Sequence, residues 1–186
     1  MKKQLLLPAL LAIGLLCVGC ATSSGKINER REHDAVLIDK VIERNASHDL
    51  NADDDIQKAC HVNVSAYNGM ALVTGEAPSA QLRNKIIAIV RVIPHVKRVH
   101  NDVSIARPSS AESRDNDALI TDNLKTVLGE IRSIPGFNGS EIKVITANGV
   151  VYLMGLVHKN EGAAAIDAAK QVIGVRKIVT KFEYID

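Results

Sequence analysis

Two stretches of this chain, residues 62–105 and 142–184, carry the same order of apolar, turn and basic positions. In each stretch an apolar segment leads to an Asn-Gly pair and then to a second apolar segment that contains a glycine, Gly75 or Gly155. The two Asn-Gly pairs lie 80 positions apart (148 − 68). A repeat of this length indicates two small domains of one kind in tandem.

The match continues beyond the glycines. Residues 92–99 match residues 172–178 when one position, the equivalent of His95, is deleted from the second copy. Both runs contain a basic pair, Lys97-Arg98 and Arg176-Lys177. We therefore expect the last strand of each domain to be built in the same way.

Each copy predicts the same succession of elements: a helix, two strands around the Asn-Gly turn, a second helix and a last strand. Asn-Gly between apolar segments is the strongest short-range signal for a β-hairpin. Asp34 in the first copy and the pair Asn116-Asp117 in the second stand where helix N-caps are expected. The expected ranges are helices 34–46, 79–93, 117–131 and 160–173, and closing strands 97–105 and 176–184.

A domain of about 70 residues with few aromatic residues must build an aliphatic core. A sheet this small is expected to bury one face, and two helices are available to cover it. The predicted fold class is α+β, with two tandem domains that each fold a small mixed three-stranded sheet under two helices in the order α-β-β-α-β. Gly75 and Gly155 are expected to adopt a conformation that is costly for other residues.

The chain starts with two lysines, an apolar run from Leu5 to Val18, and then Gly19-Cys20. An apolar run this short after basic residues is typical of a secretory signal and not of a membrane-spanning helix. A small residue directly before a cysteine marks the lipoprotein form of this signal, and Ala21 after it predicts sorting to the outer membrane, facing the periplasm. The alternative is that Cys20 is an ordinary thiol behind an uncleaved anchor or a soluble export signal.

Acyl chains on Cys20 would anchor the chain stably, since several chains on one residue hold a protein where a single chain does not. The predicted organisation is signal peptide 1–19, lipidated flexible tether 20–33, first domain 34–105, linker 106–116 and second domain 117–186.

Loss of the signal peptide removes Lys2 and Lys3, so that 21 of the 23 basic residues remain against 21 acidic residues. A chain without net charge lacks the broad basic surface that nucleic acid requires, and no nucleic-acid partner is expected. Cys17 leaves with the signal and Cys20 is modified, so Cys60 has no partner for an internal disulfide. Cys60 is expected to be a small buried thiol.

No arrangement of residues predicts catalysis or metal binding. The six histidines are scattered and lack zinc-type spacing. Asn51, Asp53 and Asp55 imitate the start of a calcium loop, but Ile56 and Val62 occupy the positions that require glycine and glutamate. Gly-rich phosphate loops and nucleophile motifs are also absent, so we expect no enzyme, no metal and no cofactor.

The paired strands around Asn-Gly, the helix after them and the basic closing strand resemble the BON domain, a bacterial module. Two copies behind Cys20 resemble the dual BON-domain lipoproteins of the outer membrane, with an especially close match from Val144 to Val157. The resemblance covers nearly the whole chain from residue 34 onward. It implies binding of anionic phospholipids such as phosphatidylglycerol and cardiolipin, support of outer-membrane integrity and a connection with cell division.

The helix expected at 117–131 presents a candidate lipid contact. At 100° per residue its core stripe consists of Ile120, Leu124, Val127 and Ile131, and Leu119 lies about 120° from the centre of that stripe. An exposed leucine can enter the acyl boundary of a membrane while a neighbouring cation meets a lipid headgroup. The resemblance to the BON family also implies that this helix is the lipid-contact surface. The chain has no Trp, so we expect each contact to be weak and to be strengthened by the tether. The predicted phospholipid-binding residues are Leu119, Asn123, Lys125, Thr126, Arg176 and Lys177.

The rival interpretation is a periplasmic scaffold that binds an envelope-assembly protein. It predicts an exposed apolar patch that is larger than one leucine and is retained in both repeats. A membrane-lytic protein is disfavoured for two reasons. The sequence has no cationic amphipathic helix of the required kind, and the mature chain is nearly neutral.

Overall fold

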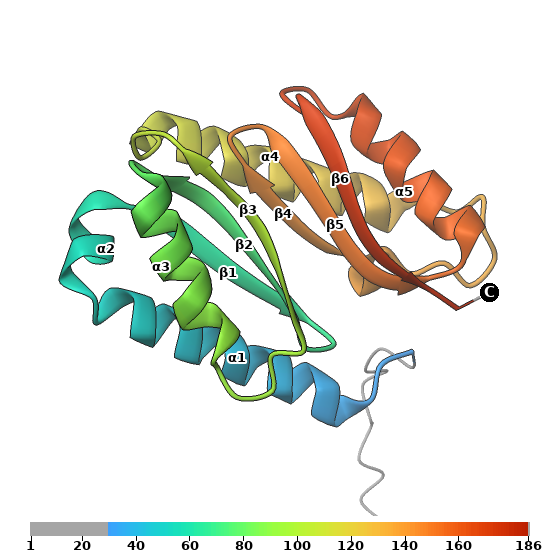
Figure 1. Cartoon of the computed structure of the whole chain (residues 1–186). Helices are drawn as coiled ribbons and strands as arrows, with labels where there is room; N and C mark the ends of the chain where they lie inside the picture. The colour runs from blue at the N-terminus through green and yellow to red at the C-terminus, as the bar shows by residue number, and fades with distance from the viewer. Residues whose placement is uncertain (1–29, 186) are drawn as a thin grey trace, which may run out of the picture.

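The computed structural model describes residues 30–185, which Figure 1 shows in colour. The predictions for the signal peptide, for Cys20 and for tether residues 20–29 lie outside the described residues. Within residues 30–185 the predicted α+β fold is confirmed. The strand orders are β1-β2-β3 and β4-β5-β6, and each sheet is mixed, with one antiparallel and one parallel pair of strands.

The two domains repeat the predicted order α-β-β-α-β. The first domain contains α1 (His33–Asn51), α2 (Asp54–Ala59), β1 (His61–Tyr67), β2 (Met70–Ala77), α3 (Ala80–Arg91) and β3 (Arg98–Ile105). The second contains α4 (Ala111–Glu130), the 3₁₀ turn η1 (Gly139–Glu141), β4 (Lys143–Ala147), β5 (Val150–Val157), α5 (Lys159–Gln171) and β6 (Lys177–Tyr184). The short helix α2 was not predicted. Its N-cap is Asp53, which accepts a hydrogen bond from the backbone N–H of Ile56, so the residues that imitate a calcium loop begin a helix.

Helix α4 begins six residues before its predicted start at 117. Ser110 is its N-cap and accepts a hydrogen bond from the backbone N–H of Ser113, so the predicted linker residues 111–116 are helical. The predicted capping role of Asp34 was also wrong, because it lies in the first turn of α1, after the N-cap Glu32.

Asp117 lies inside α4, and together with Asp39 of α1 it has a different role. Each carboxylate is buried and accepts hydrogen bonds from both backbone N–H groups of the Asn-Gly turn in its own domain, at 2.7 to 2.9 Å. All four turn residues have positive φ, as a type I′ hairpin turn requires. The first helix of each domain is thereby fastened to the hairpin.

The deleted position in the second repeat corresponds to Pro78, and the predicted deletion at His95 was wrong. The N-cap residues of α3 and α5 lie 79 positions apart (158 − 79), one fewer than the Asn-Gly turns. His95 and Gly174 consequently share one position, and both have positive φ, 71° and 94°. Ile173, which the sequence match paired with the buried Ile93, therefore stands in an exposed loop.

Gly75 has a φ of 114°, and a Cβ atom there would lie 2.0 Å from the carbonyl oxygen of His61. The expected special conformation is confirmed at this position. At Gly155 it was wrong, because φ is not positive and a Cβ atom would find its nearest neighbour at 3.3 Å.

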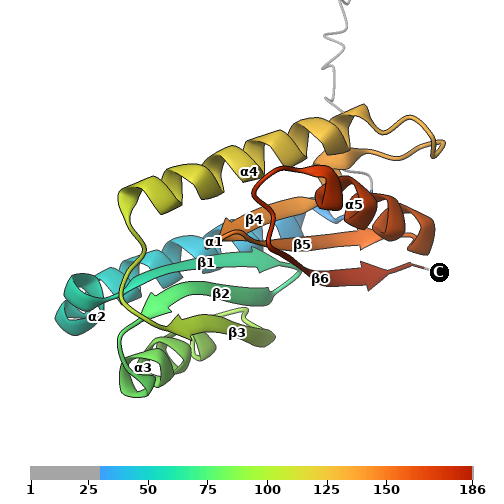
Figure 2. The same cartoon turned by 90° about the horizontal axis from the view of Figure 1, so that it is seen from above.

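The two sheets pack face to face, and the helices cover their outer faces. Figure 1 shows the resulting four layers, and Figure 2 shows the strands of the two sheets lying along one another. The expectation that each sheet buries only one face was therefore wrong for the central strands β2 and β5. Each domain has its own aliphatic core under the helices, and a third buried cluster between the sheets is formed by Tyr67, Leu72, Tyr152 and Met154.

Candidate functional site

Helix α4 presents Leu119 to solvent. Its side chain is 61% exposed, which confirms the prediction that it lies outside the core. The opposite stripe of the helix is buried against the sheet and includes one residue that the prediction lacked, Leu128, beside Ile120 and Leu124.

Three further predicted lipid-contact residues lie on the exposed surface of α4, after Leu119. Asn123 and Thr126 lie within about 40° of Leu119 around the helix axis, whereas Lys125 lies about 120° away. The Thr126 hydroxyl donates to the carbonyl oxygen of Asp122 at 3.0 Å, and the Lys125 ammonium lies 3.9 Å from the carboxylate of the same residue. The structure thus groups Asn123 and Thr126 with Leu119, and places Lys125 on a separate side of the helix.

The first half of α4 lies against the loop between α5 and β6. A Cβ atom on Gly174 would lie 2.9 Å from Cδ1 of Ile120, and the backbone N–H of Arg176 donates to the carbonyl oxygen of Gly149, in the turn that Asp117 binds. Arg176 and Lys177 are both exposed. They therefore lie at the same end of the second domain as Leu119.

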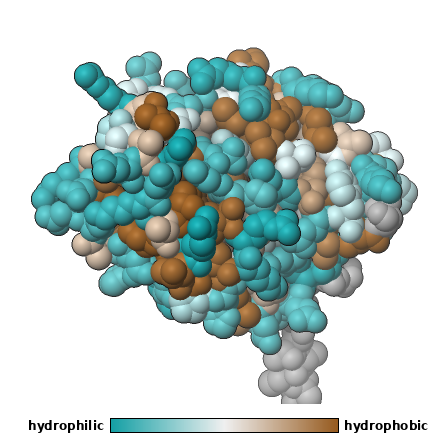
Figure 3. Space-filling model, in the orientation of Figure 1, coloured by the Kyte–Doolittle hydropathy of each residue, from teal (hydrophilic) through white to brown (hydrophobic). Residues whose placement is uncertain are grey.

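Ile173 completes this end and was not predicted. Its side chain is 93% exposed and lies next to Gly174, which contacts α4 beside Leu119. Figure 3 shows an apolar patch at the top of the view, where Figure 1 places the loop between α5 and β6. We call the group of Leu119, Ile173, Arg176 and Lys177 the α4–loop surface.

The opposite end of the second domain binds the first described residues of the chain. A guanidinium nitrogen of Arg30 donates to Glu161 at 2.8 Å, and its Nε lies 3.0 Å from Glu141. Glu161 is only 2% exposed. The hydrogen bond from Arg30 lowers the pKa of this carboxyl, and the backbone N–H of His158 lowers it further. The same bond raises the pKa of Arg30.

Arg31 is held by the first domain. Its guanidinium lies 3.9 Å from the centre of the Tyr67 ring and forms an ion pair with the buried carboxylate of Asp39. Residues 30–33 were predicted to belong to a flexible tether, and for these residues that prediction was wrong. They contact both domains, and their partners could not be inferred from the sequence.

Polar contacts join the domains at both ends of the stacked sheets. The side-chain amide of Asn68 donates to Glu183 at 2.7 Å, and that of Asn148 donates to the buried Glu76. Beside the first of these contacts, the hydroxyl of Tyr67 accepts a hydrogen bond from the backbone N–H of Leu156 at 2.9 Å. Each Asn-Gly turn, predicted only as a hairpin turn, therefore also contacts the other domain.

Residues 38–107 and residues 116–186 each match the BON domain family. The chain belongs to the BON-domain family. It is 25% identical over 178 residues to the outer membrane lipoprotein DolP of Haemophilus influenzae, which covers 91% of this chain and 89% of that protein. It is also 27% identical over 150 residues to a 21 kDa hemolysin of Actinobacillus pleuropneumoniae, covering 79% of this chain and 74% of that protein.

Among solved structures, the C-terminal domain of CdsD, a structural protein of the type III secretion system of Chlamydia trachomatis, covers 80% of this chain at 12% identity. The match spans 67% of that chain, with a TM-score of 0.31. A likeness this low bears on neither the fold nor the function of the two BON domains.

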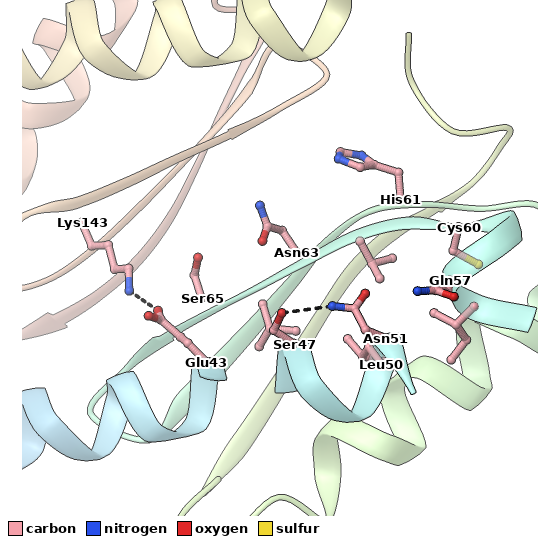
Figure 4. Close-up of a pocket in the computed structure, with 13 residues that line it drawn as sticks. Glu43, Ser47, Leu50, Asn51, Gln57, Cys60, His61, Asn63, Ser65 and Lys143 are labelled. Atoms are coloured by element: carbon pink, nitrogen blue, oxygen red, sulfur yellow. Dashed lines mark hydrogen bonds and ion pairs between the residues drawn. The ribbon is translucent and has the colours of Figure 1, made fainter. Parts of the chain in front are cut away.

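A groove of about 510 Å³ runs beside β1, the edge strand of the first BON domain. In Figure 4 it is bounded by α1, which carries Ser47 and Asn51, and at one end by the ion pair of Glu43 with Lys143 from the second BON domain. The neutral polar side chains Asn63 and Ser65 also line it. The groove is thus lined mainly by polar residues of the first BON domain, and Lys143 of the second closes one end.

The backbone of β1 is available in this groove. The N–H of Ala66 donates to Glu43 at 2.8 Å, and its carbonyl oxygen accepts from Lys143 at 3.1 Å. Along a strand, the backbone N–H and C=O groups of every second residue point to the same side. The N–H and C=O groups of Val62 and Val64 therefore point to the same side as those of Ala66, away from β2. Among residues 30–185, no hydrogen-bond partner meets them. An extended peptide has the complementary groups.

Cys60 lies near one end of this groove, half-buried against the first core, and burial raises the pKa of its thiol. In the described part of the chain no group of three or more His, Cys, Asp or Glu side chains is arranged to hold a metal ion. No helix between residues 30 and 185 is both long enough and apolar enough to cross a membrane.

Proposed function

We propose that this protein is an outer-membrane lipoprotein that binds anionic phospholipid through the α4–loop surface of its second BON domain. Acyl chains on Cys20 anchor it, and both BON domains face the periplasm. The likeness to DolP supports the location, and Gly19-Cys20 after a short apolar run supports the anchor. The proposed role is non-enzymatic: to support outer-membrane integrity in connection with cell division.

One observation carries the lipid contact: two large exposed apolar side chains, Leu119 and Ile173, lie at the same end of the domain as two exposed cations. Moving such an apolar side chain into the acyl boundary contributes roughly 1.5–3 kcal/mol, and each cation near an anionic surface contributes about 1 kcal/mol. These contributions are modest singly, and the anchor raises the effective concentration at which they act. The cations favour phosphatidylglycerol or cardiolipin over neutral lipids.

Co-sedimentation with vesicles tests this proposal. The chain from residue 21 onward keeps every contact within residues 30–185, and we expect it to bind phosphatidylglycerol or cardiolipin vesicles but not neutral ones. Leu119→Glu and Ile173→Glu should each weaken binding at least about tenfold, since a charge replaces an inserted side chain. The matched control is Leu37→Glu, at a leucine of α1 that is 48% exposed. Equal losses in all three variants, or none in the first two, would refute the contact.

A periplasmic scaffold for an envelope-assembly protein is the second candidate, and the groove beside β1 favours it. An extended segment of a partner can pair with the free backbone groups of Val62 and Val64. The apolar surface around Ile173 is not retained in both repeats, because Ile173 corresponds to Pro94 and the exposed Val92 corresponds to Gln171. Within residues 30–185, large exposed apolar residues occupy equivalent positions at Ile105 and Tyr184, at the ends of β3 and β6.

A pull-down from detergent-solubilised envelopes separates the two candidates. Val64→Pro removes a free edge donor without removing a bond to β2, so a scaffold partner should be lost with Val64→Pro and retained with Leu119→Glu. Retention of the partner by a folded Val64→Pro variant would reject the groove as its docking site.

A further inference from the structure

A second groove, of about 570 Å³, is lined from both BON domains, by residues of β3 in the first and of β6 in the second. Lys97, Arg98 and His100 line it from the first domain, and Lys181 lines it from the second. The groove therefore exists only while the two sheets are stacked. It is distinct from the α4–loop surface, none of whose residues line it.

The cations of this groove are not neutralised by ion pairs. Within residues 30–185 no carboxylate lies within ion-pair distance of Lys97, Arg98 or Lys181. Glu183, at the rim, accepts the hydrogen bond from Asn68 described above.

Other acids lie near the groove without reversing its sign. Asp102 acts on His100 from the same strand, and Glu32 and Asp34 line a neighbouring hollow that shares Lys97. Burial lowers the pKa of His100, and the charges of Lys181 and Arg98 lower it further, as expected where the local potential is positive.

We infer that this groove binds the phosphate group of an organic phosphate, with Arg98 and Lys181 as the principal contacts. Arginine presents parallel N–H groups that match phosphate oxygens, and lysine supplies a compact charge. Met70, half-buried at the cluster between the two sheets, gives the groove an apolar wall for the carbon skeleton of the ligand. Its volume is in the range of small-molecule sites.

A titration followed by amide NMR shifts tests the inference on the chain from residue 21 onward. The probes are glycerol 1-phosphate, as a free organic phosphate, and phosphatidylglycerol vesicles, which present the phosphate at a membrane. We expect the amides of residues 97–101 and 180–183 to shift with glycerol 1-phosphate. The double variant Arg98→Gln/Lys181→Gln should weaken this binding at least about tenfold, because two charge-assisted contacts are lost.

The control is Lys40→Gln/Arg44→Gln, which removes the same charge from the exposed side of α1 and should bind as the wild type does. Equal weakening in both double variants would show that binding depends only on net charge and would overturn the inference. The inference would also be overturned if neither probe shifted the amides of the groove. Shifts with vesicles alone would support the groove and identify a membrane-presented headgroup as the source. Leu119→Glu separates the two proposals, because it should weaken vesicle binding while the groove still responds to glycerol 1-phosphate.

Discussion

Replacing Arg30 by glutamine should destabilise the folded protein, because it removes the cation from a carboxylate that is almost fully buried. Glu161 would keep the backbone N–H of His158, at 2.8 Å, but would lose its charged partner. Breaking a buried ion pair costs 3–5 kcal/mol when water cannot enter. The Arg30 side chain is 22% exposed, so water replaces part of the loss, and we expect the free energy of unfolding to fall by about 2 kcal/mol.

A double-mutant cycle isolates this interaction. Urea unfolding followed by circular dichroism would compare the wild type, Arg30→Gln, Glu161→Gln and the double variant, with Arg44→Gln as a control at an exposed arginine of α1. We expect a coupling energy between Arg30 and Glu161 of about 1.5–2 kcal/mol at pH 7.

The coupling should depend on pH in one direction. The pKa of Glu161 is lowered from its ordinary value of 4.5 in the folded state, so its contribution is fully present above pH 4.5 and is lost as the pH falls through the folded value. A coupling energy below about 0.5 kcal/mol at pH 7, or one that is equal at pH 7 and pH 3, would refute the docking of Arg30.

Three further outcomes are expected. Gly75→Ala should cost at least about 3 kcal/mol or prevent folding, measured by urea unfolding, because φ is positive and the Cβ would overlap a backbone oxygen; Gly129→Ala, with no atom within 4 Å, should not destabilise. Asp117→Asn should cost about 2–3 kcal/mol in the same assay, since one buried turn N–H loses its acceptor. Tyr152, whose pKa burial raises to about 12, should ionise far above pH 10 in an ultraviolet titration. Its contribution to stability is present below pH 10 and is lost as the pH rises towards 12.

The element order was predictable because each repeat carries its own local signals. Asn-Gly between apolar segments fixes a hairpin, and the spacing of apolar residues on α4 places Leu119 outside the core. The start of α4 was missed because Ser110 and the residues after it are polar and resemble a linker, although serine is also a preferred N-cap. Ile173 was missed because the gap was assigned to His95 instead of Pro78.

The stacking of the sheets left only a partial signal in the sequence. The strand Val150–Val157 is apolar at nearly every position, which is typical of a strand buried on both faces. The equivalent strand of the first repeat carries Thr74 and Glu76 on the face that meets the other domain, and these residues hide the pattern. The bond between Arg30 and Glu161 joins residues 131 positions apart, and no local pattern predicts such a pair.

The position of Arg30 also determines how the molecule can lie on a membrane. Arg30 docks beyond the end of β5 that is farther from the α4–loop surface, and the eight residues of this strand span about 25 Å. Ten positions separate Cys20 from Arg30, so a fully extended chain between them spans at most about 36 Å. If one bilayer holds the acyl chains and also receives Leu119 and Ile173, an upright orientation would require this connection to span at least about 25 Å, more than two thirds of its maximum length. An orientation with the strands inclined towards the membrane plane shortens this span and is therefore favoured.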